Sequence, residues 1–138
     1  MVTIAFAVYA FGVVAGLLLL GRMSDTVGRR PVLLAAIVLG VATAVLFLVA
    51  EHTAVIMVAR VLSGFSAALV TGAATAAMID LAAPERRAQI GAISIVANMG
   101  GLAAGAIVAG ILAELAPAPL TTSWVVNLAL LALAAVGL

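Results

Sequence analysis

Five apolar runs divide this chain, and each is long enough to cross a lipid bilayer as a helix. The hydrocarbon core of a bilayer takes about 20 helical residues to cross. The runs cover residues 1–21, 31–50, 53–79, 90–113 and 120–138. Arg60 is the single charged residue within them. We therefore expect an all-α membrane protein with about five transmembrane helices, at residues 1–21, 31–50, 53–82, 89–113 and 120–138. No polar linker separates these runs, so the chain is expected to form one domain over residues 1–138.

The composition supports a place in the lipid bilayer and excludes several other classes of protein. With 67% hydrophobic residues, 8% charged residues and a mean hydropathy of +1.44, the chain lacks the charged surface that a soluble domain needs. Its six basic residues lie at helix ends or within an apolar run, so they form no basic face for nucleic acid. The absence of cysteine excludes disulfides, cysteine metal sites and thiol catalysis.

The positions of the arginines predict the orientation of the helices. Arginines are found in the first and third connections between the runs and are absent from the second and fourth. These five are Arg22, Arg29, Arg30, Arg86 and Arg87. Because cytoplasmic loops are enriched in basic residues, the first and third connections are expected in the cytoplasm and residue 1 outside. The sequence thus predicts a multi-pass protein of the cell membrane.

The first connection carries a fixed pattern, Gly-x-x-x-Asp-x-x-Gly-Arg-Arg. Its defining residues are Gly21, Asp25, Gly28, Arg29 and Arg30. A random basic loop between two helices would explain the arginines but not the spacing of the glycines and the aspartate. The pattern resembles the signature loop between the second and third helices of major facilitator superfamily (MFS) transporters.

Arg60 begins a second pattern in the run of residues 53–79. Together with Gly64, Ser66, Ala67 and Ala68, it resembles an MFS signature on the fourth helix, although Ser63 and Ser66 replace residues common there. An ionisable residue within a membrane segment is a candidate functional residue, so we expect Arg60 to act in coupling or in substrate binding. The alternative is an arginine that snorkels about 10 Å to the outer surface.

Small residues in two of the runs predict close helix packing. Gly64 and Gly72 belong to a row that recurs every four residues, and such small residues let helix backbones approach in lipid. Gly101, Gly105 and Gly110 resemble part of the MFS antiporter signature, but Ala106 stands where the family has a proline. Helix packing is therefore the role we favour for these three glycines. Asn98, in the middle of the same run, either hydrogen-bonds across a helix interface or contacts substrate.

The resemblance implies a group of charged residues on the cytoplasmic side that controls the change between two conformations of the transporter. In the family, the matching aspartate and arginine of the first connection latch one conformation against neighbouring helices. Asp80, at the inner end of the third predicted helix, lies at the same membrane level as Asp25 and Arg29. We therefore expect Arg29 to approach Asp80, and Asp25 to face the second half of the transporter.

The resemblance extends over the whole chain, as helices two to six of a fold that normally has twelve. It implies a partial MFS N-terminal helical bundle, with a first helix and a second transporter half missing from this chain. The implied function is transport of a small-molecule substrate by alternating access, in the form of proton-coupled efflux of a drug or sugar. An uptake carrier or uniporter of the same fold is one alternative. A small non-transporting membrane protein that packs against a partner is another.

The sequence contains no recognisable enzyme site. The single histidine, His52, lies in a predicted outer loop, with no serine or threonine placed as in a catalytic triad. We expect no cofactor and no metal. All five acids fall at helix ends or in loops, so a carboxylate that carries protons at mid-membrane has to lie elsewhere.

Overall fold

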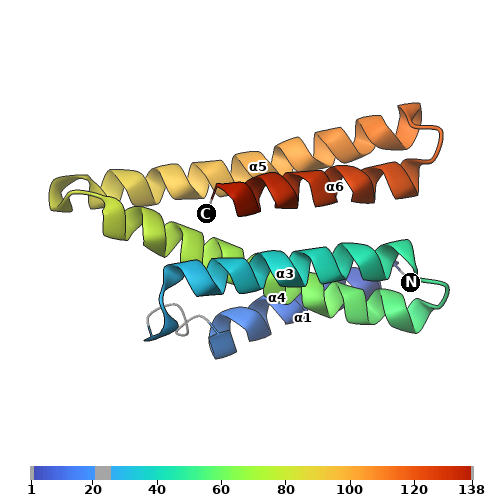
Figure 1. Cartoon of the computed structure of the whole chain (residues 1–138), viewed down its shortest axis with the longest axis horizontal. Helices are drawn as coiled ribbons and strands as arrows, with labels where there is room; N and C mark the ends of the chain where they lie inside the picture. The colour runs from blue at the N-terminus through green and yellow to red at the C-terminus, as the bar shows by residue number, and fades with distance from the viewer. Residues whose placement is uncertain (1, 21–25, 138) are drawn as a thin grey trace.

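The structure, a computed structural model, describes residues 2–20 and 26–137. In these ranges the chain forms five α-helices and one short 3-10 helix (Figure 1). They are α1 (Val2–Leu20), α3 (Arg29–Leu48), α4 (Thr53–Leu81), η1 (Pro84–Arg86), α5 (Arg87–Leu115) and α6 (Pro119–Val136). Gly21 and Asp25 of the first connection lie outside the described residues. The described part holds no strand, and the predicted all-α membrane fold is confirmed.

Length and apolarity allow three segments to cross a bilayer outright: Arg29–Leu48, Thr53–Leu81 and Pro84–Leu115. The remaining two helices, α1 and α6, are shorter and also apolar, with 19 and 18 residues. At 1.5 Å per residue they are about 27–29 Å long, close to the thickness of the hydrocarbon core, which is about 30 Å.

Glycine and proline mark where several helices begin. Gly28 precedes α3 with a φ of 101°, a conformation that side chains with a Cβ rarely adopt. Pro31 follows in the first turn of α3. N–H groups there have no partner within the helix, so the missing N–H of proline costs no hydrogen bond. Pro84 and Pro119 begin η1 and α6 in the same way.

α4 is the helix against which α1 and α3 pack most extensively. At the crossing of α1 and α4, glycines face each other and the two backbones touch. A Cβ atom added to Gly64 would lie 2.6 Å from the carbonyl oxygen of Tyr9, and one added to Gly12 would lie 2.7 Å from that of Val61. One turn along, a Cβ at Gly16 would lie 2.8 Å from the Cβ of Ala68.

The interface between α3 and α4 holds the small buried core. Its buried members are Val32, Ala36, Leu69 and Ala73. Beside them, the buried hydroxyl of Ser66 donates a hydrogen bond of 2.8 Å to the carbonyl oxygen of Ala36. Small side chains and a polar contact between helices are how helices associate in lipid, where burial of apolar surface adds little.

α5 and α6 run side by side as a hairpin (Figure 1), with α6 also packed on α3 and α5 on α4. Within α5, which is described throughout, Ser94 is the single buried residue. Its hydroxyl donates to the carbonyl oxygen of Ile90 at 2.9 Å and lies 3.6 Å from the sulfur of Met78 on α4. Most of the α5 surface is therefore left uncovered by the other described helices.

Candidate functional site

A polar cavity of about 350 Å³ lies between α1, α3, α4 and α6. It is lined by Tyr9, Gly40, Thr43, Arg60, Ser63, Ser66, Ala67, Trp124, Asn127 and Leu131. Cavities of this volume are at the lower end of the range that binds small molecules. Because its lining comes from four helices that are apolar elsewhere, the cavity concentrates polar side chains inside the bundle.

Arg60 is fixed in the cavity wall by a stack of aromatic rings. Its guanidinium carbon lies 5.2 Å from the centre of the Phe47 ring on α3, within the range of a cation–π contact. The other ring of the stack is Trp124 on α6, whose centre is 4.3 Å from that of Phe47 at an interplanar angle of 8°. The stack thus links α4, α3 and α6 beside the cavity.

Two buried polar atoms of the cavity wall have no hydrogen-bond partner among the described residues. They are the Nε of Arg60 and the hydroxyl oxygen of Thr43, a residue that is 3% exposed. Ser66, by contrast, is satisfied by Ala36, and Ser63 donates to the carbonyl oxygen of Arg60 at 2.8 Å. A buried polar group without a partner is rare in proteins, so these two atoms mark a part of the wall where an additional acceptor would be favourable.

An ion pair joins the first residue of α3 to the last turn of α4, at the other end of the bundle. The Nε of Arg29 lies 2.9 Å from Oδ2 of Asp80, with the two side chains 27% and 57% exposed. The structure therefore contains the contact that the sequence predicted between these residues. Gly28 directly precedes Arg29, and Arg30 is exposed on the first turn of α3. The role of this group in switching conformation stays a prediction.

Asn98 lies away from the polar cavity, at the contact between α4 and α5. Its side-chain nitrogen donates a hydrogen bond of 3.1 Å to the hydroxyl of Thr71. Of the glycines expected to pack helices, Gly64 lies at the α1–α4 crossing described above. A Cβ at Gly72, Gly101, Gly105 or Gly110 would meet no atom within 4 Å. For these four, a packing role stays a prediction.

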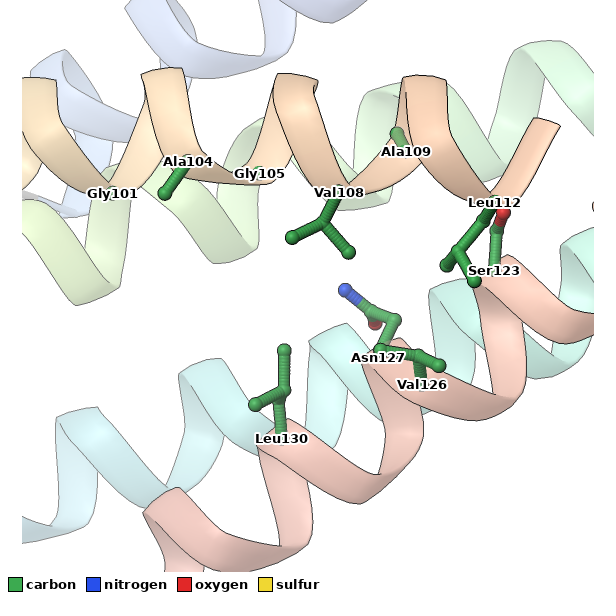
Figure 2. Close-up of a pocket in the computed structure, with 10 residues that line it drawn as sticks. All are labelled: Gly101, Ala104, Gly105, Val108, Ala109, Leu112, Ser123, Val126, Asn127 and Leu130. Atoms are coloured by element: carbon green, nitrogen blue, oxygen red, sulfur yellow. The ribbon is translucent and has the colours of Figure 1, made fainter. Parts of the chain in front are cut away.

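A second cavity, of about 340 Å³ and mostly apolar, separates α5 from α6. Gly101 and Gly105 lie in its wall on α5. Figure 2 shows Val108 of α5 and Asn127 of α6 pointing toward each other across it. Asn127 also lines the polar cavity, so this one side chain borders both spaces.

Sequence reasoning missed Thr43, Phe47 and Asn127 as neighbours of Arg60. A signal was present for two of them, since Thr43 is the one polar side chain in residues 31–50 and Asn127 the one amide in residues 120–138. Nothing in the sequence indicates that they face the same cavity. In the described ranges, no three histidine or carboxylate side chains lie close enough together to hold a metal ion.

Comparison with known proteins identifies the family. A family model described as Major Facilitator Superfamily matches residues 1–138, which is the whole chain. Comparisons with curated proteins and with solved structures found no match. Members of the matched family are transporters and not enzymes, in agreement with the sequence prediction. The chain therefore belongs to the major facilitator superfamily and is a membrane-embedded protein of small-molecule transport.

Proposed function

We propose that this chain is part of a cell-membrane transporter that exports a drug-type or sugar-type molecule in exchange for protons. The observation that carries the proposal is the polar cavity around Arg60, inside a bundle of membrane helices. Charged residues in membrane segments mark substrate or ion pathways, because placing a charge there is unfavourable without such a role. Secondary transporters hold their substrates in such a cavity and expose it to each side of the membrane in turn.

The position of the Arg29–Asp80 ion pair supports an alternating mechanism. Arg60 and Asp80 are 20 residues apart on α4, so at 1.5 Å per residue Arg60 lies about 30 Å from the ion pair along the helix. A partly exposed ion pair contributes about 1 kcal/mol or less. Such a contact biases a conformational equilibrium without locking it, as a reversible switch on the cytoplasmic side requires.

The proton-carrying group of this proposal lies outside the described helices. The acids that the structure describes, Glu51, Asp80, Glu85 and Glu114, are all exposed at helix ends or in connections, and none lines the polar cavity. The uncovered surface of α5 leaves room for further membrane helices. We therefore place the proton carrier on the other half of the transporter, which would pack against the surface that α5 leaves uncovered.

Deletion of the gene in its native cells tests this function. Accumulation of a panel of fluorescent drugs and radiolabelled sugars would be measured with and without a protonophore. Export coupled to protons predicts that deletion raises the accumulation of at least one compound, and that the protonophore removes the difference. Complementation with Arg60→Gln should fail, whereas Arg87→Gln, which removes an exposed arginine, should restore export. Lower accumulation in the deletion strain would instead identify an uptake carrier, and an unchanged panel would contradict transport of these compounds.

A further inference from the structure

We propose that Arg60 and Thr43 together form a subsite for an anionic group, such as a carboxylate, on the transported molecule. The inference rests on the proposed function, since it assigns a chemical class to the substrate of the same cavity. It narrows the proposed drug-type or sugar-type substrates to molecules that carry an acid group, which the transporter would prefer over neutral molecules of the same shape.

The first argument is the pair of unsatisfied donors. The Nε–H of Arg60 and the hydroxyl of Thr43 are buried in the wall of one cavity and find no acceptor among the described residues. Leaving a buried donor unpaired is unfavourable, and the penalty is larger for a charged group. No described acid lines the cavity, so the positive charge of Arg60 is also left without a counter-ion there. Because both residues line the same cavity, an anion bound there would lie beside both donors and supply the missing charge.

The second argument is the aromatic contact of the guanidinium group. Phe47 contacts Arg60 through its ring face, and Trp124 stacks on Phe47. The guanidinium carbon of Arg60 lies 5.2 Å from the centre of the Phe47 ring, and this cation–π contact provides no acceptor atom for the N–H donors of the group, so they remain for a carboxylate. The aromatic pair therefore acts as a positioning device that restricts Arg60 before a ligand arrives.

The third argument is the chemistry of the remaining wall. Gly40, Ala67 and Leu131 contribute apolar surface to the cavity, alongside polar side chains such as Tyr9. A volume of about 350 Å³ accommodates a small organic acid with an apolar body. A neutral analogue would fill the same space but leave the buried charge unpaired, which is the kind of loss that discriminates strongly between ligands.

Trp124 provides the assay, because it is the single tryptophan of the chain and lies in the cavity wall. The purified chain in lipid nanodiscs would be titrated with iodide, an anionic quencher of tryptophan fluorescence, at constant ionic strength. Benzoate is the competing probe, and benzamide is its neutral counterpart of nearly the same shape. We expect benzoate to protect Trp124 from iodide in a saturable manner, and benzamide to give no protection.

Three variants make the result specific. Arg60→Gln should abolish the protection, and Thr43→Val, which keeps the side-chain shape, should weaken benzoate binding on the order of tenfold. Arg87→Gln should bind benzoate like the unchanged chain, because this exposed arginine is far from the cavity. Quenching by neutral acrylamide and the far-UV circular dichroism report whether each variant keeps its fold.

Equal protection by benzoate and benzamide would overturn the anionic subsite, as would full protection in a correctly folded Arg60→Gln. An unchanged affinity in Thr43→Val would remove Thr43 from it and so refute the two-residue site. Binding is measured here without any gradient or transport. A chain that binds benzoate but exports nothing in its native cells would therefore refute the proposed export and leave the subsite standing.

Discussion

The close approach of α1 and α4 at Gly64 makes a quantitative prediction about two glycine substitutions. Gly64→Ala places a methyl group 2.6 Å from the carbonyl oxygen of Tyr9, and 2.8 Å from the backbone of Gly12 and of Val13. All three neighbours are backbone atoms, so no side chain can rotate to make room. Gly72→Ala, two turns further along the same helix, meets no atom within 4 Å and serves as the matched control.

The expected size of the effect follows from this geometry. Ordinary van der Waals contact begins near 3.4 Å, so the helices must separate locally by roughly 0.8 Å to admit the methyl group. Overpacking of this kind costs about 1–3 kcal/mol. Both variants gain the same intrinsic preference of alanine for helix, about 1 kcal/mol, so it cancels between them. Gly64→Ala should therefore be less stable than Gly72→Ala by about 1–3 kcal/mol.

Unfolding of the purified chain in mixed micelles measures this difference. Sodium dodecyl sulfate would be titrated into a mild detergent while far-UV circular dichroism and the fluorescence of Trp124 follow the loss of structure. We expect the unfolding midpoint of Gly64→Ala to fall, and that of Gly72→Ala to stay level or rise. If Gly64→Ala proved as stable as Gly72→Ala, the two helices would not cross at these backbones, and the reasoning would be refuted.

Three further predictions concern orientation, the ion pair and Arg60. In intact cells, an impermeant thiol reagent should label Thr53→Cys but not Thr26→Cys, since the first connection is expected in the cytoplasm; the opposite pattern would invert the topology. The double variant Arg29→Asp with Asp80→Arg exchanges the two charges and should recover part of the stability that each single variant loses. We expect a coupling energy between the two residues of about 1 kcal/mol or less, and high salt should remove it. A double-mutant cycle without coupling at low salt would show that the pair contributes nothing. Arg60→Lys should reach the membrane in normal amounts and still lose most transport. The lysine ammonium keeps the charge but lacks the planar group through which arginine makes two parallel hydrogen bonds. Full transport by Arg60→Lys and Arg60→Ala alike would leave an arginine that snorkels to the surface as the better explanation.

The positions of the helices could be predicted because the bilayer imposes one length on every span. Counting apolar residues against that length places helices at residues 31–50 and 53–82, and the structure has Arg29–Leu48 and Thr53–Leu81. The contact of Arg29 with Asp80 was predictable for a related reason. Arg29 begins α3 and Asp80 lies at the end of α4, so a shared depth and opposite charge already restrict their choice of partners.

The contacts between helix faces could not be predicted from the spacing of small residues. A row that recurs every four residues turns by about 40° at each step, so Gly64 and Gly72 point in directions about 80° apart. The structure has Gly64 buried against α1 and Gly72 exposed. Which member of such a row meets a neighbour depends on where the helices cross, and this is set by side chains on both of them.

The cavity was harder still to foresee, because its wall comes from four helices that are distant in sequence. Trp124 lies near the start of the apolar run of residues 120–138, a position typical of a residue at the membrane interface. The structure stacks it on Phe47, which in turn contacts Arg60. The relative rotation of α3, α4 and α6 decides this arrangement, and no periodicity within a single helix encodes it.

The crossing of α1 with α4 also sets an order of events during synthesis. α1 ends at Leu20, and α4 ends at Leu81, with α3 between them. At about 5–20 residues per second, the ribosome completes α4 roughly 3–12 seconds after α1. Throughout this interval, the surface of α1 with Gly12 and Gly16 lacks the helix that packs on it in the folded structure. The spacing of these glycines is one by which membrane helices pair with copies of themselves, so early completion of α4 would protect α1 from pairing with another molecule.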